Sequence, residues 1–325
     1  MGPLIYAHDP VKVVSITVNF RTADLALRAL EKVRADIVPM GGRCIVVDND
    51  SGDGSYEKIL STVKERGWED HVDVIPMPRN AGFGAGNNVA FRHAMGWDDP
   101  PEYFYLLNPD AYPDPGTVGH MVEFMDANPR VGLGGTKVRH PGGEIRRSAF
   151  RFPSVLSELE LALRVGVVTR LLDNHRVAQP PPETTGEVDW VSGASVMVRR
   201  AMLDEIGLFD ENFFLYFEET DLCMRAKRAG WTTNYVLEVE AEHIGQVSTG
   251  MKSTQKRRPK YWFESRSYYL RKNHGALGLF AANSVFASAY FLRELRKRYA
   301  GLKDEDPPHF FRDFVDFNFR GRLED

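Results

Sequence analysis

Cysteine is nearly absent from this sequence. The 325 residues include two cysteines, Cys44 inside an apolar run and Cys223 inside a helical pattern. Two isolated cysteines provide neither the spacing of a metal site nor a disulfide framework. The cysteine usage therefore favours a reducing compartment, and we expect a cytoplasmic protein.

The sequence also lacks an export signal and a strongly basic stripe. Residues 1–12 have neither the basic region nor the apolar stretch of a signal peptide, so export is not expected. The formal net charge is -4, and the Lys and Arg residues form no stripe that would suit a nucleic-acid groove, so we expect no nucleic acid among the partners. The 28 glycines and 19 prolines are scattered, which disfavours disorder and fibrous repeats. What remains is a globular chain whose length suggests about two domains.

One apolar run raises the question of a membrane. Residues 276–292 are uncharged, but 17 residues are slightly short for a membrane span, which needs about 20. We expect a helix packed on its own protein, and the alternatives are an interfacial anchor and a span. The run contains the polar residues Asn283, Ser284 and Ser288, and it precedes the basic residues Arg293, Arg296, Lys297 and Arg298.

Short β-branched runs alternate with amphipathic helical patterns in the first half of the chain. This alternation is typical of a mostly parallel sheet covered by helices. We expect four such units. The strands are predicted at residues 11–18, 44–47, 72–75 and 103–107, and the helices are predicted to begin at Thr22, near Ser55, near Gly84 and with Pro115 in the first turn.

Each of the four predicted strands ends in polar residues. Open α/β sheets bind ligands in the crevice outside the carboxyl ends of their strands, so polar ends that converge there predict a nucleotide site. The alternative for any single position is an ordinary turn, because Asn, Asp and Gly punctuate turns. The polar ends are Asn19, then Asp48 and Asn49, then Arg79 and Asn80, then Asn108 and Asp110.

Seven segments of the chain resemble one known family in their order and content. They are SITVNF, VVDNDSGDGS, NAGFGAGNN, YFYLLNPDAYPDPG, VDWVSGASVMVRR, FFLYFEETDLCMRAKRAGW and AEHIGQVSTG. Together they resemble the family-two glycosyltransferases, especially bacterial rhamnosyltransferases, over approximately residues 11–275. The resemblance implies an α/β GT-A fold, a Rossmann-like and mostly parallel sheet with a smaller acceptor lobe and a C-terminal helical tail. We expect a nucleotide-sugar-binding lobe at residues 1–150, an acceptor and catalytic lobe at 151–275 and the helical tail at 276–325.

The resemblance assigns the nucleotide to the first three loops. Asp48 stands where the family places a carboxylate on the nucleobase, and the N3–H of uracil or thymine needs such an acceptor. Thr17 and Asn19 are expected to line the same pocket. Asn80 and the glycine run after it resemble the loop beneath the ribose and pyrophosphate, where glycine allows close approach of the backbone. That run, Gly82, Gly84 and Gly86, lacks the later acidic residue of a dinucleotide fold, which argues against an NAD site.

Asn108-Pro109-Asp110 occupies the place of the family's DxD motif, whose carboxylates hold a divalent metal against two phosphates. Asn108 replaces the first Asp, which leaves Asp110 as the only charged ligand of the motif. His243 matches the family's C-terminal histidine, which approaches the same metal. We expect Mg²⁺ or Mn²⁺, because both accept carboxylate and phosphate oxygens. The alternatives are a turn residue for Asp110 and a structural role for His243.

The acidic cluster Glu218, Glu219 and Asp221 opens a helix after an aromatic run. In the family this position supplies the general base that removes the acceptor hydroxyl's proton during inverting transfer. The family commonly has Glu-Asp here, and this chain has Glu-Glu, so Glu219 fills the usual Asp place. The alternatives are carboxylates that stabilise a helix N-terminus and a surface pair of Asp221 with Arg225.

The segment with Trp190, Ser192 and Gly193 resembles the strand that faces the donor sugar and the acceptor. The Trp190 ring could equally belong to the core. Three arginines in GGEIRRSAFRFPS also resemble rhamnosyltransferases; we expect solvent-facing charges, with a diphosphate contact as the alternative. These arginines are Arg146, Arg147 and Arg151, and we expect His140 and His274 to be surface or packing residues.

The resemblance therefore implies an inverting, metal-dependent glycosyltransferase. We expect a nucleotide diphosphate sugar as donor, L-rhamnose from dTDP-rhamnose in first place, and a hydroxyl of a cell-surface glycan or lipid-linked glycan as acceptor. The enzymatic alternative is a UDP-sugar donor carrying galactofuranose, glucose or N-acetylglucosamine. A sugar nucleotidyltransferase would need a basic Gly-rich loop near the N-terminus, which the sequence lacks. A third alternative is a non-catalytic scaffold that binds a glycan carrier. We expect a cytoplasmic location, and peripheral association with the inner face of the plasma membrane is the alternative that stays open.

Overall fold

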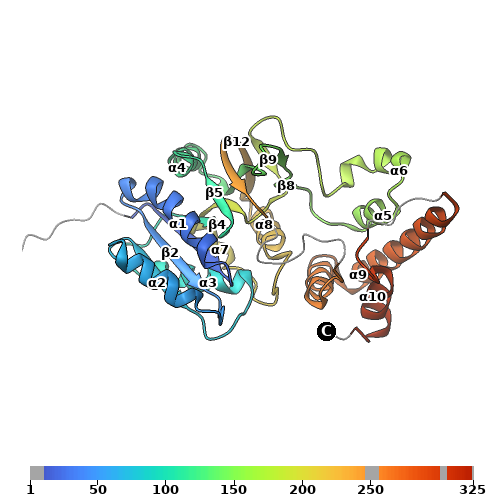
Figure 1. The fold of residues 1–325 in the computed structure, drawn as a ribbon. Helices are drawn as coiled ribbons and strands as arrows, with labels where there is room; N and C mark the ends of the chain where they lie inside the picture. Colours follow the sequence, from blue (N-terminus) through green and yellow to red (C-terminus); the bar gives the residue numbers. More distant parts are fainter. Residues whose placement is uncertain (1–10, 246–255, 301–305, 324–325) are drawn as a thin grey trace, which may run out of the picture.

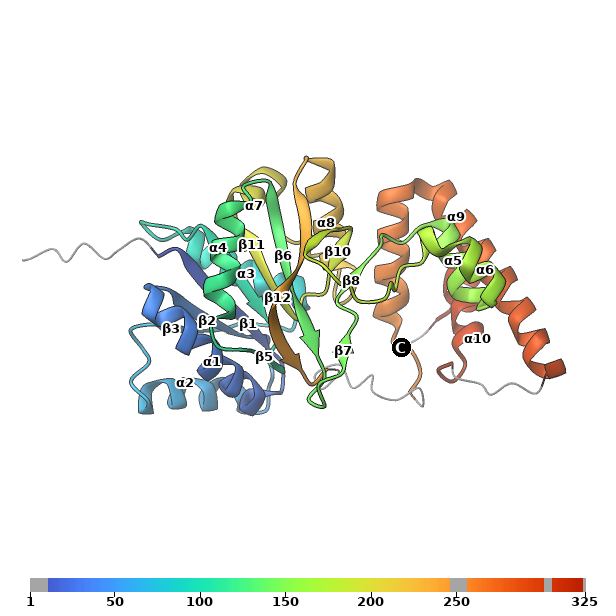
Figure 2. The same ribbon diagram turned by 90° about the horizontal axis from the view of Figure 1, so that it is seen from above.

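The computed structural model describes residues 11–245, 256–300 and 306–323. They form an α/β body with a helical module beside it (Figures 1 and 2). The body is built on a ten-stranded sheet with the main order β3-β2-β1-β4-β11-β6-β12-β5, to which β7 and β9 add side pairings, while β8 and β10 pair separately. The strands are β1 (Val13–Asn19), β2 (Arg43–Asp48), β3 (Val72–Pro76), β4 (Tyr103–Leu107), β5 (Ala111–Pro113), β6 (Val131–Arg139), β7 (Ile145–Arg146), β8 (Ala149–Phe150), β9 (Gly186–Val188), β10 (Trp190–Val191), β11 (Ser195–Arg199) and β12 (Thr232–His243).

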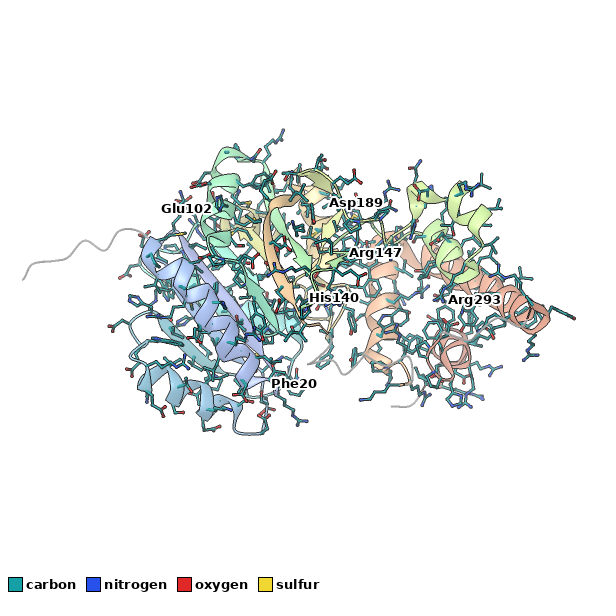
Figure 3. All side chains as sticks on the ribbon, turned by 45° about the horizontal axis from the view of Figure 1, so that its top comes forward. Phe20, Glu102, His140, Arg147, Asp189 and Arg293 are labelled. Atoms are coloured by element: carbon teal, nitrogen blue, oxygen red, sulfur yellow. The ribbon has the colours of Figure 1, made fainter. Side chains whose placement is uncertain are left out.

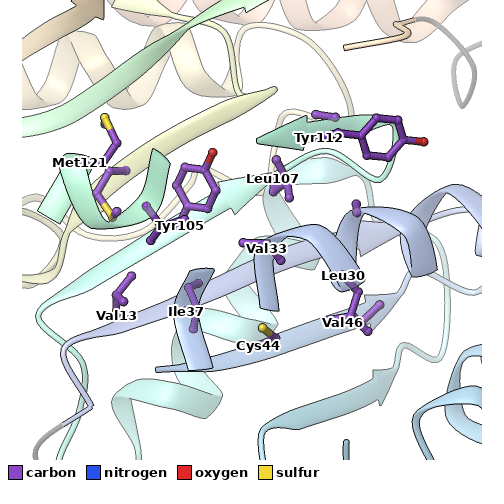
Figure 4. Close-up of a cluster of buried hydrophobic side chains, with 14 of the residues drawn as sticks. Val13, Leu30, Val33, Ile37, Cys44, Val46, Tyr105, Leu107, Tyr112 and Met121 are labelled. Atoms are coloured by element: carbon purple, nitrogen blue, oxygen red, sulfur yellow. The ribbon is translucent and has the colours of Figure 1, made fainter. Parts of the chain in front are cut away.

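The first four strands are parallel, and helices cover both faces of the sheet. Val13 of β1 belongs to the core under one set of helices, whereas Val14 and Ile16 belong to the core on the other side. The strands therefore appear in the sequence as continuous apolar runs. Part of the first core, with Leu30 and Tyr105, is drawn in Figure 4. That face carries α1 (Ala23–Ile37), η1 (Val38–Met40), α2 (Ser55–Glu65) and α4 (Thr117–Ala127), and the other carries α3 (Phe83–Met95), α7 (Arg200–Ile206) and α8 (Glu218–Arg228).

The four strand–helix units predicted from the sequence are present, with bounds that differ by one or two residues. Pro115 was expected in the first turn of a helix, but α4 begins at Thr117 after a left-handed Gly116. The side chain of Asp36 accepts hydrogen bonds from the backbone N–H groups of Gly116 at 2.8 Å and Val118 at 3.2 Å. A carboxylate from a distant helix therefore caps α4, which local sequence does not reveal.

The second half of the sheet is mixed. Strand β11 runs antiparallel between β4 and β6, and β12 runs parallel to β6 with an irregularity between Val236 and Glu240. The sheet is therefore continuous across residue 150, where the sequence suggested a boundary between two lobes. That division stays a prediction.

The helical module combines segments far apart in the sequence. It contains α5 (Val155–Leu163), α6 (Gly166–Leu171), η2 (Asp173–His175), α9 (Lys260–Ala300), α10 (Phe310–Val315) and η3 (Asp316–Arg320). Arg266 of α9 is buried, and it donates hydrogen bonds to Glu158 at 2.6 Å and Asn283 at 2.7 Å. Figure 3 labels Arg293 in this module and Phe20 at the lower edge of the α/β body. The residues expected as a tail, 276–325, thus pack against α5 from the preceding segment.

Helix α9 consists of two helices joined at Gly275, whose φ of 72° interrupts the helical geometry. The predicted start of the tail at residue 276 lies at this kink. Among the described residues, α9 is the one helix long and apolar enough to cross a membrane by length and composition. Buried residues along one of its faces contact the rest of the module, and several large apolar side chains on the other face are exposed.

Candidate active site

A buried polar corner joins the carboxyl ends of β1 and β2. Asp48 Oδ1 accepts hydrogen bonds from Asn19 Nδ2 at 2.7 Å and from Ser51 Oγ at 2.6 Å. Asp48 Oδ2 accepts one from the Ser51 backbone N–H at 3.1 Å, which leaves this oxygen able to accept one more donor. Thr17 is buried on β1, two residues before Asn19. The sequence prediction omitted Ser51, although it lies in the same DNDSGDGS segment.

A cleft of about 340 Å³ adjoins this corner. It lies between the loops that precede α1 and α2 and the first turns of these helices. The Arg21 backbone N–H donates to Ser51 Oγ at 2.9 Å, so the cleft and the corner share one loop. The lining residues are Arg21, Thr22, Ala23, Asp24, Leu25, Asp53, Gly54, Ser55 and Lys58.

The loop after β3 is held by Asn49 and Asn80. Asn80 Oδ1 accepts hydrogen bonds from Asn49 Nδ2 at 3.0 Å and from the Gly82 backbone N–H at 3.1 Å. Gly82 has a φ of 93°, and a Cβ at this position would collide with the carbonyl of Phe214. The Phe83 backbone N–H donates to the same carbonyl at 3.1 Å. The glycine loop is therefore docked on the aromatic segment that leads to the acidic cluster.

Glu219 stands directly against the backbone of Gly193. Its Oε1 accepts a hydrogen bond from the Gly193 N–H at 3.1 Å. Burial raises the pKa of the Glu219 carboxyl, although the hydrogen bond from Gly193 acts to lower it. Glu219 is partly exposed as a residue, whereas Glu218 and Asp221 are buried.

The other two acidic residues are enclosed. Glu218 is 1% exposed, and burial and the charge of Glu219 raise its pKa well above the ordinary value. Asp221 is fully buried and accepts hydrogen bonds from Arg225 at 2.9 Å and Lys272 at 2.9 Å. Lys272 belongs to α9, so Asp221 connects α8 to the helical module. The surface pair considered for Asp221 and Arg225 is instead a buried one.

One short segment, residues 193–194, connects the Asn-Pro-Asp motif with the acidic cluster. The Asn108 backbone N–H donates to the carbonyl of Ala194 at 3.0 Å, and Gly193, the neighbour of Ala194, contacts Glu219. Asp110 is 3% exposed, and its Oδ1 lies 3.1 Å from His243 Nε2. Burial acts to raise the pKa of Asp110, but the hydrogen bond and charge of His243 outweigh it and hold this pKa below its ordinary value. The two residues expected to share a metal are thus adjacent.

Asp110 and His243 suit one divalent cation. They supply one carboxylate oxygen and one imidazole nitrogen, which are both ligands of Mn²⁺, and Mg²⁺ would use chiefly the oxygen. Within the described residues no third His, Cys, Asp or Glu joins them as a cluster. Phosphate oxygens and water would complete the coordination, as is usual where a metal is held against a nucleotide.

Arg146 reaches the same place from β7. Its Nη1 donates to the carbonyl of His243 at 3.1 Å. Burial lowers the pKa of this guanidinium, and the charge of Asp110 acts in the opposite direction. Arg146 is half-buried, whereas Arg147 is exposed, so the expectation of solvent-facing charges holds for Arg147 and is wrong for Arg146. Pairing of β6 with β7 turns Arg146 toward Asp110, and local sequence gives no sign of this.

Trp190 and Ser192 lie on the segment that leads to Gly193. The Trp190 ring stacks on Phe150 with centroids 4.3 Å apart, and its Nε1–H donates to the carbonyl of Arg151 at 2.9 Å. Ser192 Oγ accepts a hydrogen bond from the Ala194 N–H at 3.2 Å. The polar edge of Trp190 is therefore satisfied within the protein, and its contact with sugar stays a prediction.

Two proteins similar in sequence to this chain are rhamnosyltransferases. The chain is 29% identical over 227 residues, 63% of its length and 67% of the relative's, to an N-acetylglucosaminyl-diphospho-decaprenol L-rhamnosyltransferase of Mycobacterium tuberculosis. It is 24% identical over 164 residues to the rhamnosyltransferase WbbL of Escherichia coli, covering 50% of this chain and 60% of that one.

Solved structures share the fold at low sequence identity. Staphylococcus aureus TarS in complex with UDP-GlcNAc superposes with a TM-score of 0.54 at 15% identity, over 94% of this chain and 81% of that one. A Pyrobaculum calidifontis mannosyltransferase with GDP-Man and Mn²⁺ gives 0.54 at 15% identity, over 92% and 80%. The sequence profile described as glycosyl transferase family 2 matches residues 13–206, more than half of the chain. The chain therefore belongs to glycosyl transferase family 2, has the GT-A fold and is similar to rhamnosyltransferases.

Proposed function

We propose that this glycosyltransferase moves L-rhamnose from dTDP-rhamnose to a hydroxyl of a lipid-linked glycan, with inversion at the anomeric carbon. The observation that carries the proposal is the carboxylate of the partly exposed Glu219, which Gly193 holds on the segment that also contacts the Asn108 loop. The names of the two relatives support the choice of sugar, and the mycobacterial name supports a lipid-linked acceptor.

Glu219 is proposed as the general base. It would accept the proton of the acceptor hydroxyl while the hydroxyl oxygen bonds to the anomeric carbon. The bond from that carbon to the diphosphate breaks on the opposite side, so dTDP leaves and the configuration inverts. Glu218 is enclosed and its raised pKa disfavours the ionised form that a base needs, and Asp221 is held by two cations, so Glu219 is the choice within the cluster.

The remaining residues are proposed to hold the donor. The free acceptor position on Asp48 Oδ2 suits the N3–H of thymine, which uracil shares. Asp110 and His243 would hold a divalent cation, which supplies neutralisation of the charge on the departing diphosphate. The guanidinium of Arg146, beside Asp110, is suited to hydrogen-bond a phosphate oxygen directly.

Transfer assays with a panel of donors test the proposal. The enzyme and Mn²⁺ are incubated with dTDP-rhamnose, UDP-galactofuranose, UDP-glucose or UDP-GlcNAc and with N-acetylglucosaminyl-diphospho-polyprenol. Mass spectrometry identifies the product, and NMR compares its anomeric configuration with that of the donor. We expect product with dTDP-rhamnose alone and with inverted configuration. Transfer from a UDP-sugar instead contradicts the choice of donor, and neither transfer nor hydrolysis with any donor would favour the scaffold alternative.

A further inference from the structure

The second half of α9 has an apolar outer face. Its inner face is buried within the helical module, where α5 and α10 contact the helix. Four large apolar side chains project on the opposite side at helical spacing. They are Leu277, Phe280, Phe291 and Leu292, with exposed fractions of 86%, 64%, 53% and 57%.

The outer face of this part of α9 lacks the charged side chains that a water-facing helix normally carries. Residues 276–292 contain no Asp, Glu, Lys or Arg. The charged Arg293 lies instead on the buried face, with 3% exposure. A helix at a water-exposed surface normally places charged residues outward, so this arrangement marks a surface suited to an apolar environment.

Basic and aromatic residues border the end of the apolar face. Arg298 and Tyr299 are exposed at the end of α9, and Tyr299 is suited to a membrane–water interface. Arg296 Nη2 donates to the carbonyl of Arg164 at 3.1 Å, which places the start of α6 beside this end. The outward side chains of α6 are again apolar with one basic residue, namely Val167, Leu171 and Arg170.

The charge of the chain is strongly uneven. Residues 256–325 contain 15 Lys and Arg against 9 Asp and Glu, whereas residues 1–255 contain 26 against 36. The segment that forms most of the helical module is therefore basic, and the α/β body is acidic. An anionic lipid surface attracts the first and repels the second, which orients the molecule.

We propose that the outer face of the second half of α9, together with α6, docks on the surface of an anionic lipid bilayer. The helix lies in the plane of the interface, with its apolar side chains among the acyl chains and Arg298 at the headgroups. A membrane-crossing orientation conflicts with the inner face, which carries Arg293 and packs on α5 and α10. A second copy of the chain would bring two basic surfaces together, so charge favours the lipid. This inference does not depend on which sugar the enzyme transfers.

Vesicle flotation of the full chain tests the proposal. The probes are phosphatidylcholine vesicles with and without phosphatidylglycerol, and the variant is Phe280→Ser combined with Phe291→Ser. We expect binding that requires phosphatidylglycerol, and a partition coefficient at least about tenfold lower for the variant because two buried aromatic side chains are lost. Met40→Ser removes a partly exposed apolar side chain from the α/β body and should bind as the wild type does.

Two further measurements make the outcomes distinct. Unchanged circular dichroism and dTDP affinity establish that the variant is folded, and Leu277→Ser replaces it if it is not. Equal vesicle binding by wild type and variant would overturn the proposal, because charge alone would then account for adsorption. Absence of vesicle binding would also overturn it, as would a wild-type dimer in size-exclusion chromatography that the variant dissociates, because the face would then join two copies.

Discussion

The backbone N–H of Gly193 and the carboxylate of Glu219 are 3.1 Å apart, and this contact leaves no room for a side chain on residue 193. A Cβ there would lie 2.9 Å from Glu219 Oε1 and 3.2 Å from the ring of Phe83. The segment before β11 thus fixes the position of the carboxylate.

Gly193→Ala is expected to displace Glu219 with little effect on donor binding. A methyl group at this position forces the carboxylate away from its present site, and a misplacement near 1 Å costs about 10²-fold in rate. Single-turnover transfer with saturating donor, together with calorimetry of dTDP, makes the comparison. Unchanged turnover would show that Glu219 does not need this contact.

Glu219→Gln is expected to lower kcat by about 10²- to 10⁴-fold, the usual contribution of a general base, with donor affinity nearly unchanged. Asp221→Asn serves as the control, since its main effect should be on stability. Asp221 is buried between Arg225 and Lys272, and breaking a buried ion pair costs about 3–5 kcal/mol. Urea unfolding measures that loss. Normal turnover by Glu219→Gln with an inactive, folded Asp221→Asn would assign the base to Asp221.

The acid limb of the pH–rate profile should lie above the ordinary range of glutamate, about pH 4.3. Burial raises the pKa of Glu219, and a base must be ionised, so activity is lost as pH falls through this raised pKa. Burial and the charge of Glu219 raise the pKa of Glu218 well above its ordinary value, so we expect a neutral Glu218 on this limb, and Glu218→Gln should leave the limb in place. The kcat/KM profiles of the two proteins provide the test, and a displaced limb in Glu218→Gln would contradict the assignment.

Arg146→Gln is expected to weaken dTDP binding by about tenfold, the loss of one hydrogen bond to a charged group, and to leave thymidine binding unchanged. The reason is its position beside His243 and Asp110, where the diphosphate rather than the nucleoside is expected. Arg147→Gln is the matched control because Arg147 is exposed on the same hairpin. Calorimetry that finds equal losses for the two variants would mean that general charge, not position, accounts for the effect.

Asp110→Ala is expected to abolish transfer and the Mn²⁺-dependent part of dTDP affinity. Asp110 supplies the carboxylate next to His243. Without this carboxylate, His243 is the one member of the pair left to bind a divalent cation. Calorimetry of dTDP with Mn²⁺ and with EDTA measures the difference. Full turnover of the wild type in EDTA would contradict the metal-dependent mechanism.

The α/β class, the strand–helix order of the first half and the family are all encoded locally. Buried parallel strands appear as apolar runs, and their polar ends appear as Asn and Asp before turns, so a linear pattern is sufficient to find them. The ordered motifs named the family, and the profile match over residues 13–206 confirms it.

Tertiary structure decided what each polar residue contacts. The sequence could not rank Glu218, Glu219 and Asp221, because burial and cation contacts depend on α9 and β11, which are distant along the chain. The sequence predicted a solvent-facing Arg146, whereas the pairing of β7 with β6 places this residue beside Asp110. The sequence likewise shows that residues 276–292 are apolar, but it does not show which face of the helix is exposed. Packing of α9 against α5 and α10 determines that face.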